Sequence, residues 1–332
     1  MVDVFTASAV QSFTDTPTPF ALSDSASEPS TVVLIDGQKI SLSNYSDDQL
    51  ERLHFDQELA FAAAISESPK NSQQRVETIR HAYQTVCNIL DEISLRSGNS
   101  GMLSMGMDAR YTRLVLEILS RQRKKSVGDG IFEVGFGSGL LLRAASEAGY
   151  RVAGLEVAPQ LLQSARQILP ANCHDGLLLG DFRNVDLERH QGRYSLVYWN
   201  DVFEHIPVDE ISDYLVRIRS LLAPGGKLLT ITPNWHMRPS DVTCVFKPPR
   251  TEAIGFHLKE YTLREVNQLL VAAGFSRVQT PTYISRKRIW MPSVGDCTLV
   301  KTVFEPMLEW LPFKAAVQCC RRFGFNCTLA TN

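Results

Sequence analysis

The chain has 332 residues, enough to bury a sizeable core, and its 34 Lys and Arg residues nearly balance its 36 Asp and Glu residues. The formal net charge of −2 excludes a global field that would recruit DNA, RNA or an anionic membrane, and leaves local charged patches open. No run approaches the roughly 20 apolar residues of a membrane span, and the N-terminus lacks the basic and apolar parts of a signal peptide. The seven cysteines show neither CxxC pairs nor zinc-type ligand spacing. We therefore expect free thiols, no bound metal, no integral membrane segment and a cytoplasmic location.

The first part of the chain divides into a tail and a helical extension. Residues 1–31 are rich in Ser, Thr, Pro and Asp and contain no Lys or Arg, a composition that predicts a disordered tail. Asp36-Gly37 stands between two short apolar runs and predicts a hairpin with a two-residue turn. Apolar residues then recur at three- and four-residue steps in two stretches, which predicts helices. Residues 32–125 are therefore expected to form a hairpin plus helical extension that could cover an active site.

From residue 126 onwards, strand patterns alternate with helix patterns. This alternation is typical of a mostly parallel sheet with helices on both faces, so residues 126–332 are predicted to form a doubly wound α/β domain. The expected strands are 131–134, 151–155, 177–179, 195–199, 227–232, 275–282 and 326–330. The expected helices between them are 139–148, 158–168, 208–222 and 262–273.

A glycine-rich loop, EVGFGSG at 133–139, joins the first of these strands to the first helix. Glycines let the backbone turn tightly and approach a ligand, while free N–H groups at the helix start face the bound molecule. The next strand ends at Glu156, about 20 residues further on, where a carboxylate can accept both hydroxyls of a ribose. The pattern predicts a nucleoside-binding site.

Two nucleoside cofactors compete for such a site, a nicotinamide dinucleotide and S-adenosylmethionine. The dinucleotide pattern GxGxxG needs its third glycine at Leu140, but here it stands one residue earlier, at Gly139. Glu133 borders the loop, and a carboxylate about 4 Å from a pyrophosphate would oppose it by several kcal/mol at an effective dielectric of about 20. The same carboxylate favours an ammonium or sulfonium group. Both features favour S-adenosylmethionine over the alternative of a nicotinamide-dependent oxidoreductase.

Residues 126–282, together with the last strand, resemble the class I S-adenosylmethionine-dependent methyltransferases, which have a Rossmann-like fold. The resemblance implies that the glycine loop cradles the amino acid part of the cofactor and that Glu156 holds its ribose. It also implies that Asp181, in Gly180-Asp181-Phe182, lies near the adenine amino group and that Phe182 packs against the adenine ring. A turn-capping role is the alternative for Asp181.

The stretch after the fourth expected strand, NDVFEHIP at 200–207, is similar to a segment of this family that often carries Glu-His. Here Asn200 could contact the cofactor through its backbone, and Asp201 and Glu204 could position the cofactor or cap the next helix. Methyl transfer from a sulfonium mainly requires orientation, but a hydroxyl acceptor must lose a proton, and histidine titrates near neutrality. His205 and His257 are therefore the candidate bases, with a structural histidine as the alternative. The candidate cofactor-binding residues are Glu133, Gly135, Gly137, Gly139, Glu156, Asp181, Phe182, Asn200 and Asp201.

The methyl acceptor is narrowed by motifs that the chain lacks. Methylation of base amino groups usually accompanies an Asn/Asp-Pro-Pro-aromatic tetrad, and residues 200–203 contain neither proline. The Pro-Cys nucleophile of cytosine methylation is also absent, which disfavours a base-flipping DNA enzyme. We therefore expect transfer to an O or N atom of a small-molecule, glycan or lipid-like acceptor. The alternatives are a catalytically degenerate cofactor-binding partner subunit and a protein or RNA methyltransferase.

Two insertions, 235–256 and 285–325, are expected to follow strands and to set acceptor specificity. The second contains an apolar face, and core packing is the favoured explanation for it, ahead of binding a hydrophobic acceptor or forming a homodimer. That face consists of Val300, Val303, Phe304, Met307, Leu308 and Leu311.

Overall fold

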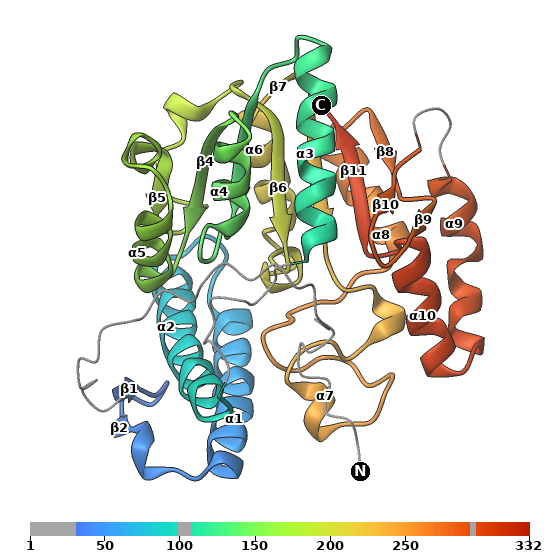
Figure 1. Ribbon diagram of the computed structural model, residues 1–332. Coiled ribbons are helices and arrows are strands. Elements are labelled where there is room, and N and C mark those ends of the chain that lie inside the picture. The colour runs from blue at the N-terminus through green and yellow to red at the C-terminus, as the bar shows by residue number, and fades with distance from the viewer. Residues whose placement is uncertain (1–30, 99–107, 293–296) are drawn as a thin grey trace.

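The structure is a computed structural model that describes residues 31–98, 108–292 and 297–332. The predicted disordered tail therefore lies outside the described residues, apart from Thr31. The described residues are organised around one seven-stranded sheet (Figure 1). Its strands are β3 (Gly130–Val134), β4 (Arg151–Glu156), β5 (Leu177–Leu179), β6 (Tyr194–Asn200), β7 (Leu222–Ile231), β8 (Arg277–Gln279) and β11 (Cys327–Thr331).

The strand order, β5-β4-β3-β6-β7-β11-β8, is that of a doubly wound sheet with one reversed strand. Neighbours from β5 to β7 pair in parallel, whereas β11 runs antiparallel to both β7 and β8. β7 begins at Leu222 rather than at the expected Lys227, because its pairing with β6 continues across an irregularity at Tyr194 and Leu196. The predicted Rossmann-like, mostly parallel fold is confirmed.

Helices cover both faces of the sheet and bury its apolar side chains. On one face, α3, α4 and α5 form a core with β3, β6 and β7, and on the other face α6 and α8 do so. α3 was grouped with the N-terminal extension on sequence grounds, yet its buried Leu114, Val115, Ile118 and Leu119 pack on the sheet. These helices are α3 (Ala109–Lys124), α4 (Leu140–Glu147), α5 (Pro159–Ile168), α6 (Ile211–Leu221) and α8 (Leu263–Ala272).

The N-terminal extension comprises strands β1 (Thr31–Val33) and β2 (Lys39–Ser41) and helices α1 (Asp47–Glu67) and α2 (Gln73–Arg96). The hairpin exists, but its turn is longer than expected, because Val33 pairs with Lys39 and leaves residues 34–38 as the loop. α1 and α2 pack on each other below the sheet, at the end towards which the arrowhead of β6 points (Figure 1). The extension therefore covers the carboxyl ends of the central strands, where open α/β sheets bind ligands.

A buried charge network ties α2 to the sheet domain. The Arg75 guanidinium donates to Glu210 at 2.7 Å and to Asp209 at 2.8 Å. The second oxygen of Glu210 accepts from Arg183 at 2.8 Å, and Arg183 in turn pairs with Asp181. Breaking a buried pair of this kind leaves an uncompensated charge, which is costly, so the network holds the extension in one position.

The two insertions lie against each other beyond β7 and β8. Glu309 joins them, because it accepts from Arg238 at 2.7 Å and from His236 at 2.9 Å. The elements of this region are η6 (Trp235–Met237), α7 (Thr243–Phe246), β9 (Tyr283–Ile284), β10 (Ile289–Trp290), α9 (Thr298–Phe304), η7 (Glu305–Trp310) and α10 (Phe313–Phe323). The remaining short helices are η1 (Leu42–Asn44), η3 (Ala171–Gly176), η4 (Glu188–His190) and η5 (Phe203–His205).

The expected core packing of the second insertion's apolar face is wrong for most of its members. Leu308 is buried, but the side chains of Val300, Val303, Phe304 and Met307 are at least half exposed. All seven cysteines are free thiols. Within the described part of the chain, no helix is both long and apolar enough to cross a membrane.

Candidate active site

The glycine loop leaves β3 and enters α4 through three residues in the left-handed region. Gly135, Gly137 and Gly139 have φ angles of 69°, 54° and 79°, which non-glycine residues rarely adopt. A Cβ on Gly139 would lie 2.8 Å from the Cβ of Ala165, so this glycine permits α4 to approach α5. A Cβ on Gly137 would meet nothing within 4 Å, so the middle of the loop borders open space. The loop thus presents its backbone to a ligand.

Glu156 ends β4 and faces this loop. Its Oε2 accepts from Gly137 N at 2.9 Å, and its Oε1 accepts from Val157 N at 2.8 Å and from Ala158 N at 3.1 Å. Burial raises the pKa of Glu156, and these three donors oppose that shift. The carboxylate therefore supports the loop itself and retains acceptor capacity for a ligand.

Glu133 lies on β3 with a buried carboxyl group. Its Oε2 accepts no hydrogen bond from any of the described residues. Burial raises the pKa of Glu133 well above its usual range, and the neighbouring Glu156 raises it further. A buried carboxyl group without a partner is costly unless a cation or donor reaches it, so this group is suited to receive a positively charged ligand.

The pair expected to contact the adenine is engaged within the protein. Asp181 forms a bidentate ion pair with Arg183 and also accepts the Arg183 backbone N–H at 2.9 Å. The Phe182 ring is buried, with its centroid 5.4 Å from that of Tyr214 and the Arg217 guanidinium 5.5 Å away. In this state Asp181 caps a turn, as the alternative interpretation describes, and both residues pack at the carboxyl end of β5.

Asn200 and Asp201 follow β6 directly. The Asn200 amide donates to Asp201 at 2.7 Å, while its buried Oδ1 has no hydrogen-bond partner in the part of the chain that the structure describes. Asp201 adopts a left-handed backbone with φ of 52°, and its N–H donates to Ile231 O at 3.1 Å. This unusual conformation turns the chain sharply away from the sheet.

The two candidate bases lie together, although 52 positions separate them in the sequence. Their ring centroids are 5.0 Å apart, and Glu204 joins them, with its Oε1 3.9 Å from His257 Nε2. The sequence makes Glu204 a candidate for positioning the cofactor or capping a helix, and only the structure places its carboxyl group beside both histidines. One ligand atom from each of Glu204, His205 and His257 lies within 4.8 Å of the others.

Hydrogen bonds orient both imidazole rings. His205 Nδ1 lies 2.9 Å from Phe256 O and must donate, because a carbonyl oxygen only accepts. His257 Nδ1 lies 3.0 Å from Glu260 Oε1. Ring nitrogens held in this way leave Nε2 for a proton or a divalent cation, and imidazole with carboxylate is a common metal-ligand set. The trio could hold a metal, because the fold joins ligands from separate segments that sequence spacing does not mark, and the expectation of no bound metal stays a prediction.

The three groups have strongly shifted pKa values. Burial lowers the pKa of His205 to about 3, and His257 adds to that shift. Burial opposes a charge on His257, but the Glu260 hydrogen bond and the proximity of Glu204 raise its pKa to about 9. Burial and the nearby Asp201 raise the pKa of Glu204 to about 8. Such shifts are typical of functional sites, where burial and charge are arranged for chemistry.

The N-terminal extension closes this part of the site. The ring of Tyr83, from α2, lies 6.2 Å from His205 and 5.7 Å from Phe256. Glu58, from α1, accepts the Phe256 N–H at 3.0 Å. Helices α1 and α2 therefore contribute side chains to the surroundings of His205.

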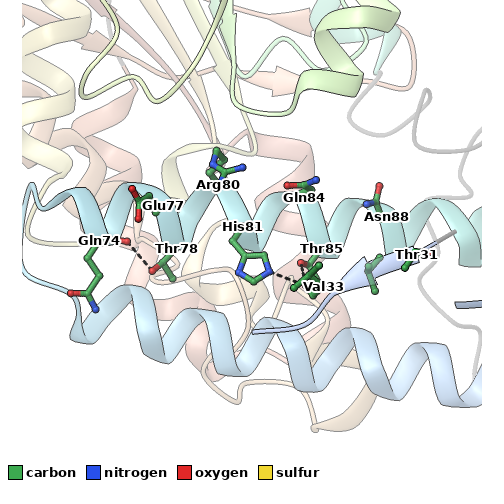
Figure 2. Close-up of a pocket in the computed structure, with 11 residues that line it drawn as sticks. Thr31, Val33, Gln74, Glu77, Thr78, Arg80, His81, Gln84, Thr85 and Asn88 are labelled. Carbon is green, nitrogen blue, oxygen red and sulfur yellow. Dashed lines mark hydrogen bonds between the residues drawn. The ribbon is translucent and has the colours of Figure 1, made fainter. Parts of the chain in front are cut away.

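Figure 2 shows a separate surface cleft of 480 Å³ between α2 and β1. None of the predicted site residues lines it. His81 Nε2 and Thr85 Oγ1 both bond to Val33 O, at 2.8 and 2.7 Å, and Thr78 donates to Gln74 O at 2.9 Å. The two bonds to Val33 hold the hairpin on α2, and the cleft is not the candidate site because none of the predicted site residues lines it.

The glycine loop, the strand order and the acidic residues on β3 and at the end of β4 define a class I S-adenosylmethionine-dependent methyltransferase domain, with S-adenosylmethionine as its cofactor. Residues 132–228 match the family model described as "Methyltransferase domain".

Curated relatives are similar to about a third of the chain. A ubiquinone biosynthesis O-methyltransferase of Xanthomonas axonopodis pv. citri (strain 306) is 29% identical over 116 residues, 34% of this chain and 46% of that protein. The protein of the same name from Xanthomonas campestris pv. campestris (strain B100) is 32% identical over 114 residues, 32% of this chain and 44% of the relative. The match therefore spans less than half the length of either relative.

Solved structures are similar to more of the chain. A methyltransferase solved in complex with the Haloferax volcanii Trm112 methyltransferase activator has a TM-score of 0.47 at 22% identity, over 73% of this chain and 96% of that chain. A S-adenosylmethionine-dependent methyltransferase from Archaeoglobus fulgidus has a TM-score of 0.39 at 14% identity, over 67% of this chain and 94% of that chain.

Proposed function

We propose that the protein transfers a methyl group from S-adenosylmethionine to an oxygen atom of a small, lipid-like acceptor. The observation that carries the cofactor part is the buried Glu133 carboxyl group with an unpartnered oxygen beside a glycine loop that borders open space. The ammonium or sulfonium group of S-adenosylmethionine would give this carboxyl group a positively charged partner, whereas a pyrophosphate would be repelled.

In this proposal, the cofactor lies across the carboxyl ends of β3, β4 and β6. Gly135, Gly137 and Gly139 present their backbone to its amino acid part, and Glu156 accepts from its ribose. Asp181 and Phe182 border the adenine, and Asn200 and Asp201 border the side facing β6. For Asp181 to accept from the adenine amino group, it must share its oxygens between that group and Arg183, which a carboxylate with four acceptor positions can do.

Two observations support a lipid-like methyl acceptor. The curated relatives are named ubiquinone biosynthesis O-methyltransferases, which points to a hydroxyl on a lipid-like molecule. The surroundings of His205 are aromatic on the side of the extension, through Tyr83 and Phe256. An aromatic wall of this kind suits an apolar ring more than a charged polymer.

A hydroxyl acceptor must lose its proton, and the Glu204, His205 and His257 cluster is placed to assist. His205 Nε2 keeps a free lone pair because Nδ1 donates to Phe256 O, and the neighbouring Glu204 is the stronger proton acceptor, because burial lowers the pKa of His205 to about 3 whereas that of Glu204 is raised to about 8. His257, held between Glu204 and Glu260, positions the His205 ring. His205→Ala should lower turnover while S-adenosylhomocysteine affinity stays nearly constant. An equal loss of both would show that His205 is structural, and turnover after chelation and re-addition of Mg²⁺ or Zn²⁺ tests the metal option.

The cofactor assignment is tested by calorimetric titration of the full chain with S-adenosylhomocysteine, with NADH as the parallel control. Micromolar binding of S-adenosylhomocysteine alone is the expected result. Binding of NADH would overturn the assignment. Binding without turnover of any phenolic or lipid-like acceptor would favour a catalytically degenerate subunit.

A further inference from the structure

The segment formed by α9 and η7 is inverted relative to an ordinary surface helix, because its apolar side chains face outward. Leu299 is 74% exposed, Phe304 57% and Trp310 83%, and Val300, Val303 and Met307 on the same turns are also exposed. An exposed apolar patch of this kind on a folded protein usually marks an interaction surface. We call these six residues the apolar rim.

The polar side chains of the same segment face the protein and fix this orientation. Lys301 Nζ donates to Pro281 O and Phe323 O, and Thr298 Oγ1 donates to Val278 O at 3.2 Å. Glu305 accepts from Leu263 N at 2.6 Å and from Arg264 N at 3.0 Å at the start of α8. Turning the apolar rim inward would break these buried bonds, so the rim stays exposed unless a partner covers it.

The exposed charged side chains in the stretch of sequence that contains the apolar rim are of one sign. Within the described part of 284–323, every exposed charged side chain is cationic, while Glu305 is buried and Glu309 is paired with Arg238. Three of these cations lie on α10, which packs on η7 and lies beside α9 at one edge of the molecule (Figure 1). The exposed cations are Arg286, Lys287, Lys314, Arg321 and Arg322.

We propose that the apolar rim and its cations dock the protein on an anionic lipid bilayer, with Phe304 and Trp310 entering the boundary between headgroups and acyl chains. Interfacial elements combine apolar and aromatic side chains with Lys and Arg in this way, and Trp favours that depth. A second copy of the chain fits less well, because a two-fold contact through this surface would bring the same cations together. The docking is separate from the cofactor site.

The test is flotation of the full chain with vesicles of phosphatidylglycerol and phosphatidylcholine, compared with phosphatidylcholine alone. Wild type should float with the anionic vesicles, less so at high salt. The double variant Phe304→Ser/Trp310→Ser should partition at least about tenfold more weakly. The matched control is Val216→Ser/Val271→Ser, which removes similarly exposed apolar side chains from α6 and α8 and should float like wild type. A second variant, Arg321→Gln/Arg322→Gln, should weaken the salt-dependent part of the binding to anionic vesicles.

Two results would overturn the proposal. One is equal flotation of wild type and the Phe304/Trp310 variant, with thermal unfolding showing that both are folded. The other is no flotation together with a dimer, measured by light scattering, that the same variant dissolves, because the apolar rim would then bind a second copy.

Discussion

At the scale of single residues, the buried acidic group beside the glycine loop defines the site most sharply. The Glu133 side chain is buried and one of its oxygens has no hydrogen-bond partner among the described residues, which costs free energy whenever the group is ionised. Glu156, by contrast, accepts three backbone donors and is stabilised by the protein itself. The two carboxyl groups are therefore expected to respond differently to neutralisation.

Replacement of Glu133 by Gln should weaken S-adenosylhomocysteine binding roughly 10- to 100-fold, the range for loss of a charge-assisted hydrogen bond of about 1.5–3 kcal/mol. The unliganded variant should be no less stable, because the raised pKa of Glu133 means that its ionisation destabilises the folded wild type as pH rises above 4.5. Glu147→Gln, at an exposed site on α4, is the control for calorimetry and should bind normally.

The same shift predicts a pH dependence of cofactor binding. Below its raised pKa, Glu133 is protonated in the free protein and must release a proton to pair with the cofactor cation. Affinity for S-adenosylhomocysteine should therefore rise with pH until Glu133 is ionised, and Glu133→Gln should flatten that slope. If the pH dependence of affinity persists unchanged in Glu133→Gln, a different titratable group causes it.

The glycines of the loop should separate binding from folding. Gly137→Ala should cost about 1–2 kcal/mol of stability because Ala disfavours the left-handed φ of this position. The new Cβ meets no neighbour within the protein, so it adds no steric cost there, but it should block the cofactor. Gly139→Ala adds a 2.8 Å contact with Ala165 to the same backbone cost and should destabilise the protein more. Urea unfolding and calorimetry on both variants check this order. Equal stability losses would mean that α4 can shift away from α5.

At the scale of elements, α2 is held by charge as much as by packing. Arg75→Met should lower the free energy of unfolding by about 1–3 kcal/mol, because the fully buried Glu210 loses one of its two cations but keeps its pair with Arg183. Arg52→Met removes an exposed pair with Asp56 on α1 and should cost less than about 1 kcal/mol. Similar small losses in urea unfolding would show that apolar packing alone anchors α2.

The α9 and η7 segment shows where apolar periodicity misleads. Its apolar stripe predicted core packing, but the elements packed on it offer carbonyl oxygens and backbone N–H groups, which Lys301, Thr298 and Glu305 satisfy. Apolar periodicity indicates that a helix has an apolar face and a polar face. It does not determine which of the two faces packs against the rest of the protein.

At the scale of the whole molecule, the N-terminal helices and the sheet enclose the site together. Tyr83 and Glu58 reach residues around His205 from α2 and α1. Binding of S-adenosylhomocysteine should therefore slow amide hydrogen exchange in both helices, while α9 exchanges as before. Unchanged exchange in both helices would place the extension away from the bound cofactor.

Much of the fold followed from local sequence. All seven sheet strands were expected within a few residues of their observed positions, because apolar runs bounded by turn residues have few other structures open to them. The hairpin turn was misjudged, because docking of Ile35 N on Gln57 favours a longer loop than Asp-Gly alone requires. The roles of the nine cofactor residues remain predictions.

The sequence by itself determined the α/β class and the positions of the glycine loop and of Glu133 and Glu156, since each depends on residues adjacent in the chain or on adjacent strands. Only the tertiary structure decided that His257 joins Glu204 and His205, that Arg75 anchors the extension, and that the apolar rim faces outward. These features depend on contacts between distant segments, and such contacts are selected by the packing and charge balance of the whole chain, which no local pattern encodes.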